Sequence, residues 1–213
     1  MKTWQYFTSL LLLSLAGCAT NHAEQLRTLD SRTLCCINYS EVLIQNELTT
    51  PIDVAIDETS QVIATEKGFS YFYPVKLPDK SSGKTLAIKS EGGAPIVLNM
   101  AIGGHLYFLP SVTFLDGDKN KIATAHDHYP IGLCEGFTCS GGLLSRFKIP
   151  EKSKYALIHA NRQRTGEFYY APMTRTPPGM TIVAGAIPVQ VGSNNSALHV
   201  IFSINGKINI SVQ

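Results

Sequence analysis

From Pro51 onward, the chain alternates apolar and polar residues or carries short apolar runs, and these segments are bounded by Gly, Pro, Asn and Asp. Such a pattern predicts β-strands joined by turns, because a period of two places alternate side chains on opposite faces of an extended strand. The spacing is typical of a β-sandwich, and we expect a mainly β, single antiparallel, jelly-roll-like domain over residues 34–213. The expected strands are 70–76, 84–89, 96–102, 112–115, 144–149, 154–160, 179–184, 199–204 and 207–212.

Two local signals refine this expectation. Residues 38–48 mix apolar residues with helix formers, Ser40 is placed to cap, and Thr49-Thr50-Pro51 is placed to stop, so we expect one short helix there. Near the C-terminus, Asn205-Gly206 separates two apolar strands and suits a type I′ turn, which predicts a terminal hairpin. Its second strand should turn Ile208 and Ile210 inward.

The first residues predict export. A leucine run at 10–13 is followed by small residues and then by Cys18, which fits a bacterial lipobox. The apolar run is too short for a membrane span. We therefore expect residues 1–17 to be a lipoprotein signal peptide, Cys18 to carry the lipid, including palmitate, and residues 18–33 to be a tether. Ala19 in place of aspartate directs such a lipoprotein to the outer membrane, facing the periplasm.

Size and charge limit the partners. Without its signal peptide the chain has roughly 190 residues, which is enough for one domain with a sizeable core. The 18 basic and 16 acidic side chains almost cancel. Because no basic block is available for phosphates of a nucleic acid, we expect no nucleic-acid partner and a membrane contact through the lipid alone.

Four further cysteines predict disulfides, because the periplasm is oxidising. The doublet Cys35-Cys36 and the pair Cys134 and Cys139 suggest two cross-bridges between the N-terminal segment and the later loop. The rival pairing joins Cys134 to Cys139 and Cys35 to Cys36, and the sequence leaves both open. Zinc held by these cysteines with His126 and His128 is disfavoured, because the spacing matches no compact zinc motif.

The remaining polar motifs have simple structural readings. The stretch 116–120 has oxygen-bearing side chains at alternate positions, as a calcium loop does, but it lacks the later ligands and reads as a strand-ending turn. His126-Asp127-His128 reads as a solvated loop. His105, His159 and His199 lie in apolar surroundings and are expected in the core or an interface. We expect no metal and no cofactor.

Catalytic motifs are missing from the sequence. Gly68-Phe69-Ser70-Tyr71 lacks the final glycine of a nucleophile elbow. There is neither a phosphate-binding glycine loop with its lysine nor a dinucleotide fingerprint. We therefore expect a binding protein and no enzyme.

Aromatic residues are the best binding candidates, since sugar rings stack on aromatic side chains. Two long connections, 117–142 and 161–178, are where binding residues are expected. The second contains Phe168, Tyr169 and Tyr170 close to Arg162, Arg164 and Arg175. Alternation should bury about half of these rings. Tyr169, Tyr170 and Arg164 are the predicted ligand-binding residues.

Several stretches together resemble the maltose operon periplasmic protein family. The resemblance runs from about Cys35 to the end, and it rests on Cys35-Cys36 and the stretches 70–78, 85–90, 109–116 and 154–158. It implies a periplasmic protein associated with maltose and maltodextrin uptake, and it brings no catalytic residues. The expected function is a non-catalytic lipoprotein accessory to carbohydrate transport that contacts a glycan, such as maltodextrin, or a transport protein. The alternative is a structural envelope lipoprotein that binds a protein partner and no small ligand.

Overall fold

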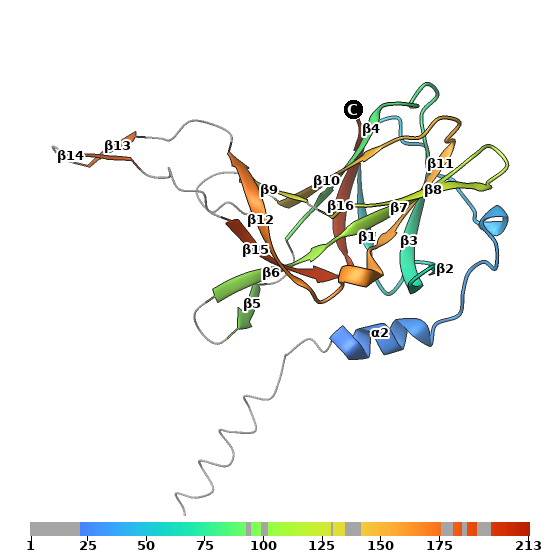
Figure 1. Ribbon diagram of the computed structural model, residues 1–213, viewed down its shortest axis with the longest axis horizontal. Helices are drawn as coiled ribbons and strands as arrows, with labels where there is room; N and C mark the ends of the chain where they lie inside the picture. Colours follow the sequence, from blue (N-terminus) through green and yellow to red (C-terminus); the bar gives the residue numbers. More distant parts are fainter. Residues whose placement is uncertain are drawn as a thin grey trace, which may run out of the picture.

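Figure 1 shows a computed structural model of the chain, which describes residues 22–213 except 93–94, 99–101, 129, 135–141, 176–180, 185–186 and 191–196. Cys18 and the expected signal peptide lie outside the described residues, as does Cys139. Within the described part, no helix is long and apolar enough to cross a membrane.

Strands dominate the chain, as the alternation predicts. Its elements, in order, are α2 (His22–Asp30), the 3-10 helix η2 (Tyr39–Glu41), β1 (Ile52–Ile56), β2 (Val62–Thr65), β3 (Gly68–Lys76), β4 (Thr85–Ser90), β5 (Pro95–Leu98), β6 (Ile102–Phe108), β7 (Pro110–Leu115), β8 (Lys121–His126), β9 (Ile131–Cys134), β10 (Gly142–Lys148), β11 (Tyr155–Ala160), the 3-10 helix η3 (Arg162–Arg164), β12 (Phe168–Arg175), β13 (Thr181–Ala184), β14 (Ile187–Gln190), β15 (Ala197–Ser203) and β16 (Gly206–Val212).

The described strands form three sheets. The largest has the order β1-β16-β4-β10-β9-β12-β15-β6-β5, the second has the order β2-β3-β11-β7-β8, and β13 pairs with β14. Most pairs are antiparallel, but β12 with β9 and β15 with β6 are parallel. β6 and β7 follow each other directly, so the chain passes from the large sheet to the second sheet at Leu109.

The main core lies between these two sheets and confirms the mainly β, sandwich-type fold. Alternate residues of the second sheet, such as Val112, Phe114 and Ile158, pack in one cluster with residues of the large sheet, such as Leu86 and Ile210. Burying both inner faces together removes a large apolar area from water, which is the main stabilising term of such a fold.

Several strands lie where the sequence pattern predicts none. The expected connections 117–142 and 161–178 contain β8, β9 and all of β12, and β1, β2 and β14 are also additional to the expected strands. The expected strand 96–102 is a β5–β6 hairpin. These strands are short or mix apolar with Gly, Thr and His residues, so their alternation is weak in the sequence.

The predicted terminal hairpin is wrong. β16 pairs with β1 and β4, whereas β15 pairs with β12 and β6. Asn205 has no positive φ, which a type I′ turn requires at both central positions. Gly206 is needed for a different reason: a Cβ there would lie 2.9 Å from the Cβ of Phe108. The inward orientation of Ile208 and Ile210 is nevertheless confirmed, since both are buried.

The helix lies earlier than expected. The described residues contain one α-helix, α2, at 22–30, and residues 38–48 contain only the single turn η2. α2 lies beside β3 (Figure 1), and its Leu29 is buried in the main core. At the end of the helix, the Asp30 carboxylate accepts two hydrogen bonds from the Arg162 guanidinium, at 3.0 and 3.1 Å. The packed part of the chain therefore begins before residue 34, inside the expected tether.

Candidate functional site

The second sheet also has an outer face, and its two halves differ. On the apolar half, Phe72, Leu115 and Leu157 form a buried cluster with Cys36 and Val42. We call residues 35–48, which supply those last two side chains, the strap. On the polar half, hydroxyl and imidazole groups take the place of apolar side chains. The strap therefore covers the half of the face that most needs shielding from water.

The strap is fixed to the sheet at both ends. The backbone N–H of Cys35 donates to the carbonyl of Val62 at 2.9 Å, and that of Leu48 donates to the carbonyl of Lys76 at 2.9 Å. In between, the Lys119 ammonium donates to the carbonyls of Ser40 and Val42 at 3.1 and 2.8 Å. These bonds satisfy backbone groups that would otherwise face the sheet unpaired.

The disulfide of the strap corrects the preferred pairing. Cys35 and Cys36 are bonded to each other, so the expected cross-bridges from this doublet to Cys134 and Cys139 are not formed. The rival pairing had this link. The side chain of Cys134 and all of Cys139 lie outside the described residues, so the second bridge of that pairing stays a prediction, and the disfavoured zinc alternative also falls there.

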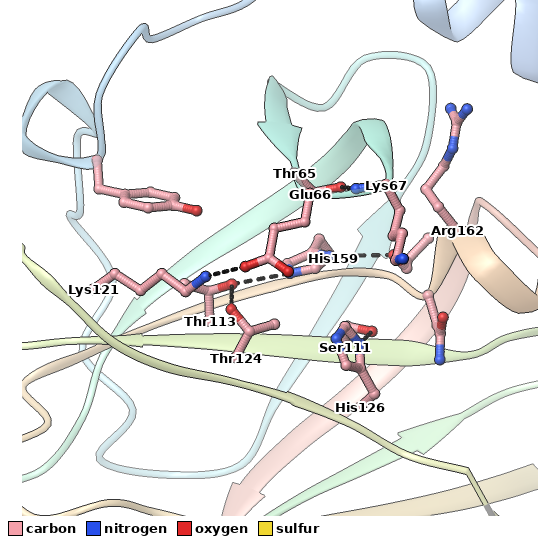
Figure 2. Close-up of a pocket in the computed structure, with 13 residues that line it drawn as sticks. Thr65, Glu66, Lys67, Ser111, Thr113, Lys121, Thr124, His126, His159 and Arg162 are labelled. Carbon is pink, nitrogen blue, oxygen red and sulfur yellow. Dashed lines mark hydrogen bonds and ion pairs between the residues drawn. The ribbon is translucent and has the colours of Figure 1, made fainter.

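A small pocket occupies the polar half of the outer face (Figure 2). In its floor, Ser111 and the Nδ1 of His126 share a hydrogen bond of 2.7 Å. Beside it, the hydroxyl of Thr113 lies 3.1 Å from that of Thr124 and 3.1 Å from the Nε2 of His159. Ser111 and Thr113 point the same way from β7, because alternate residues of a strand share a face.

The hydrogen-bond partners of His159 show which of its ring nitrogens carries the proton. Its Nδ1 lies 3.2 Å from the carbonyl oxygen of Ala160, which can only accept. Nδ1 therefore carries the proton, Nε2 accepts, and the Thr113 hydroxyl donates to it. Burial lowers the pKa of His159 to about 4, so the ring is neutral near pH 7. His159 is buried, as its apolar surroundings predicted; the side chains of His105 and His199 lie outside the described residues.

Charged residues form the rim of the pocket. Glu66, in the β2–β3 turn, pairs with Lys121 of β8 at 2.5 Å. The Arg162 guanidinium, already paired with Asp30, also donates to the carbonyl of Phe69 at 2.9 Å. Lys67 lies on the same rim, and its ammonium has no ion-pair partner among the described residues. The rim therefore carries more positive than negative charge.

His126 stands between this rim and the floor. Its pKa is lowered, first by burial and then by the neighbouring His128, with Lys121 and Lys67 adding to the effect and Glu66 opposing it. The ring is therefore neutral near pH 7, and a negative charge placed beside it would favour its protonated form.

The pair of Ser111 and His126 does not form a nucleophilic site. Ser111 is fully buried, so its hydroxyl cannot reach a substrate carbonyl. His126 binds it through Nδ1 and not through the Nε2 that takes the serine proton in the common triad. The contact reads as a structural hydrogen bond between β7 and β8.

The predicted ligand-binding residues lie at the other sheet: Tyr169 and Tyr170 are on β12, and Arg164 is in η3, shortly before this strand. Tyr169 points inward and stacks on Phe202, with ring centroids 5.6 Å apart. Tyr170 points outward and is 59 % exposed, and Phe168, which is 40 % exposed, lies beside it at a centroid distance of 6.0 Å. Of the two predicted tyrosines, only Tyr170 thus offers a ring to a ligand, and Phe168 joins it.

Arg164 holds this region together. Its guanidinium donates to both oxygens of the Glu167 carboxylate at 2.7 and 2.9 Å, and to the carbonyl of His128 at 2.6 Å. It also lies over the rings of Tyr169 and Phe202, at 5.1 and 4.9 Å from their centroids. Because these contacts use its donors and its flat face, Arg164 is placed to support the strand, and the predicted ligand contact stays untested.

The stretch 116–120 forms the β7–β8 turn. Asp116 Oδ1 accepts the backbone N–H groups of Asp118 and Asn120 at 2.9 and 2.8 Å, as a turn-closing aspartate does. The oxygens that a cation would need are therefore used within the turn. No group of three His, Cys, Asp or Glu side chains that could hold a metal ion occurs in the described residues.

Sequence reasoning missed the pocket itself. Its floor combines Ser111 and Thr113 with Thr124 and His126, each pair spaced by two residues, and the pairing of β7 with β8 brings the four together. The spacing is visible in the sequence as alternate polar residues, but β8 falls inside the expected connection 117–142. Comparison of the chain with protein-family models, with curated proteins and with solved structures finds no match.

The low pKa of His159 predicts a pH-dependent stability. In the unfolded chain this histidine takes up a proton near pH 6.5, whereas in the folded chain it does so only near pH 4. Between these values the unfolded state binds more protons, so the free energy of unfolding falls as the pH is lowered from 6.5 to 4, by up to about 1.4 kcal/mol per pH unit. Urea unfolding at pH 7.5, 6 and 5 measures this dependence of the free energy of unfolding on pH.

A matched pair of variants isolates the cause. His159→Gln should lower stability at pH 7.5 and flatten the slope, because its side chain does not titrate. His128→Gln changes an exposed histidine and should keep the slope. An unchanged slope in His159→Gln would contradict the assignment.

Proposed function

We propose that the chain is a lipid-anchored protein of the periplasmic side of the outer membrane that binds a carbohydrate without transforming it, as an accessory to maltose or maltodextrin uptake. The observation that carries the proposal is the outward-facing ring pair of Phe168 and Tyr170 on β12. The resemblance of the sequence to the maltose operon periplasmic protein family supports the choice of sugar.

The ring pair suits an oligosaccharide for geometric reasons. Sugar rings present apolar C–H faces, which stack on aromatic side chains. Residues two apart on one strand project from the same face and lie about 7 Å apart along it, and the two centroids here are 6.0 Å apart. The two ring planes are inclined at 56° to each other, so they offer a glycan two neighbouring stacking faces and not one flat surface.

The support beneath the rings favours binding. β12 is paired with β15 on one side and with β9 on the other. Tyr169, Phe202 and the Glu167-paired Arg164 pack behind it. A platform that is already ordered loses little conformational entropy when a ligand binds. Arg164 and Tyr169 thus act on binding through the position of Tyr170.

The absence of catalysis in this proposal rests on two observations. In the serine–histidine pair of the pocket the serine is buried and does not present a nucleophile, and the sequence resemblance brings no catalytic residues with it. A binding role asks only for a surface of suitable shape and chemistry.

The alternative function has its own observation. Ile37 and Leu43, both on the strap, are 86 % and 68 % exposed, which favours contact with a protein partner. In that case the protein is a structural envelope lipoprotein with no small ligand. The two functions differ in their response to a soluble saccharide.

Maltodextrin should stabilise the purified full chain. A saturable rise in melting temperature is expected, because a ligand that binds only the folded state shifts the unfolding equilibrium. Tyr170→Ala and Phe168→Ala should each weaken the affinity about tenfold, equivalent to about 1.4 kcal/mol. Ile122→Ala, which trims a surface apolar residue of β8, should leave the affinity unchanged. No saturable shift in the unaltered protein would reject carbohydrate binding and favour the protein-partner alternative.

Cys18 should carry the lipid. In cells fed labelled palmitate, the unaltered chain should take up the label and sediment with outer membranes, because a diacylated cysteine anchors a protein stably. Cys18→Ser should lose the label and appear in the soluble fraction. Label retained by the Cys18→Ser chain would contradict lipidation at this residue.

A further inference from the structure

The disulfide of the strap joins two neighbouring residues, Cys35 and Cys36. A disulfide is expected to stabilise a fold by closing a loop of the unfolded chain, and the effect grows with the length of that loop. This bond closes no such loop, because no residue lies between its two cysteines, and it links the strap to no other element. Its contribution to the stability of the fold is therefore small.

Other contacts hold the strap in place. The backbone N–H groups of Cys35 and Leu48 donate to carbonyls of the second sheet, and the Lys119 ammonium donates to two carbonyls of the strap. The side chains of Val42 and Leu48 are buried in the two apolar clusters. None of these contacts uses a sulfur atom, so they can persist when the disulfide is broken.

The two cysteines differ in their access to solution. Cys35 is exposed, whereas Cys36 is only 6 % exposed and packs in the apolar cluster of the outer face. A thiolate from solution therefore approaches the bond from the side of Cys35, which the hydrogen bond to Val62 keeps in place. An accessible sulfur with a second, resolving sulfur beside it is the arrangement of an exchangeable disulfide.

We propose that the Cys35–Cys36 bond is a site of thiol–disulfide exchange, at which a dithiol is oxidised as the bond is reduced. The site lies on the strap and is separate from the ring pair of β12. The proposal therefore depends neither on carbohydrate binding nor on lipid attachment. It gives a chemical role to a bond that holds no two elements of the fold together.

The exchange takes place in two steps. A thiolate of the dithiol first attacks the Sγ of Cys35 and forms a mixed disulfide with it, while the Cys35–Cys36 bond breaks and its electron pair leaves with the Sγ of Cys36, which takes up a proton from water. The second thiolate of the dithiol then attacks the partner sulfur of the mixed disulfide, and Cys35 leaves as a thiolate that is protonated in turn. The dithiol ends as a disulfide, and the two cysteines of the strap end as thiols.

The dithiol can be a small molecule or part of a protein, and the surroundings of the bond favour a protein. Ile37, the next residue after the disulfide, is 86 % exposed, and an exposed apolar side chain beside the reacting sulfur suits contact with a protein surface. Reduced thioredoxin, as a protein dithiol, and dithiothreitol, as a small one, compare the two sources at equal concentration. Faster reduction by thioredoxin assigns the co-reactant to proteins, and faster reduction by dithiothreitol assigns it to small thiols.

Reduction of the purified, oxidised full chain tests the site. Trypsin cleaves after Arg32 and Lys67 and releases residues 33–67 as one peptide, which contains Cys35 and Cys36 and no other cysteine. The chain is treated with dithiothreitol with and without urea, quenched by alkylation and digested, and the mass of this peptide reports the reduced fraction. Reduction of the folded chain should proceed within about tenfold of the rate in urea, because Cys35 is accessible. A rate in the folded chain more than about a hundredfold below the rate in urea overturns the proposal.

Two matched variants locate the attacked sulfur. Cys36→Ser leaves the exposed thiol, and Cys35→Ser leaves the buried one. With oxidised glutathione, the mixed disulfide should form on the 33–67 peptide of the Cys36→Ser chain at least about tenfold faster, because reactivity follows exposure. Equal rates in the two chains contradict the assignment of Cys35.

Hydrogen exchange separates an exchange site from a structural bond. The Leu48 amide, which donates to Lys76, should keep its protection after reduction, because the contacts that hold the strap do not use the disulfide. Loss of that protection on reduction shows that the bond is structural and overturns the proposal. The readouts belong to the strap and not to Tyr170, so they are independent of the maltodextrin titration.

Discussion

The fold depends on covering the outer face of the five-stranded second sheet. Its inner face packs against the large sheet, but Phe72, Leu115 and Leu157 point the other way and are also buried. Exposing three large apolar side chains would cost several kcal/mol, at about 1.5–3 kcal/mol each. The strap meets this need, and its hydrogen bonds to Val62 and Lys76 fix it in register. The strap, which precedes the first strand of the sandwich in the chain, is therefore part of its buried interior.

The incomplete cover explains the pocket. Beyond the strap, the outer face carries Ser111, Thr113 and His159 in the places where apolar side chains would need a lid. Their hydrogen bonds satisfy one another, which lets these buried polar groups lie in a shallow pocket without further protein above them. One constraint on the sheet thus gives both a closed apolar half and an open polar half.

The sequence predicts the fold class well and the topology poorly, for physical reasons. Alternation reports burial, so the strands with strong apolar alternation, such as the one around Ile208 and Ile210, are predicted correctly. A dipeptide that is typical of a turn can also occur where no such turn forms, because its glycine is needed for close packing. Asn205-Gly206 suits a hairpin, but Gly206 is required by the close approach of Phe108, and the two flanking strands pair with different partners. Tertiary packing decides such cases.

The candidate sites, too, are predictable from the sequence only where alternation decides which side chains face inward. Alternation predicts that about half of the β12 aromatics face inward, and it is Tyr169 that does so, while Phe168 and Tyr170 face outward. Nothing in the sequence indicates that the Arg164 guanidinium pairs with the Glu167 carboxylate, three residues away, and lies over the rings of Tyr169 and Phe202. Those contacts depend on how β12 meets β15, which only the assembled sheet defines.

The central claim is that the strap is an integral layer of the fold, and amide hydrogen exchange tests it most directly. If the claim holds, the amides of Cys35 and Leu48, which donate to Val62 and Lys76, exchange within about tenfold of core amides of β11 such as that of Leu157. If these two amides instead exchange as fast as that of Ile37, which is bonded only to an exposed carboxylate, the strap is peripheral and the account is wrong.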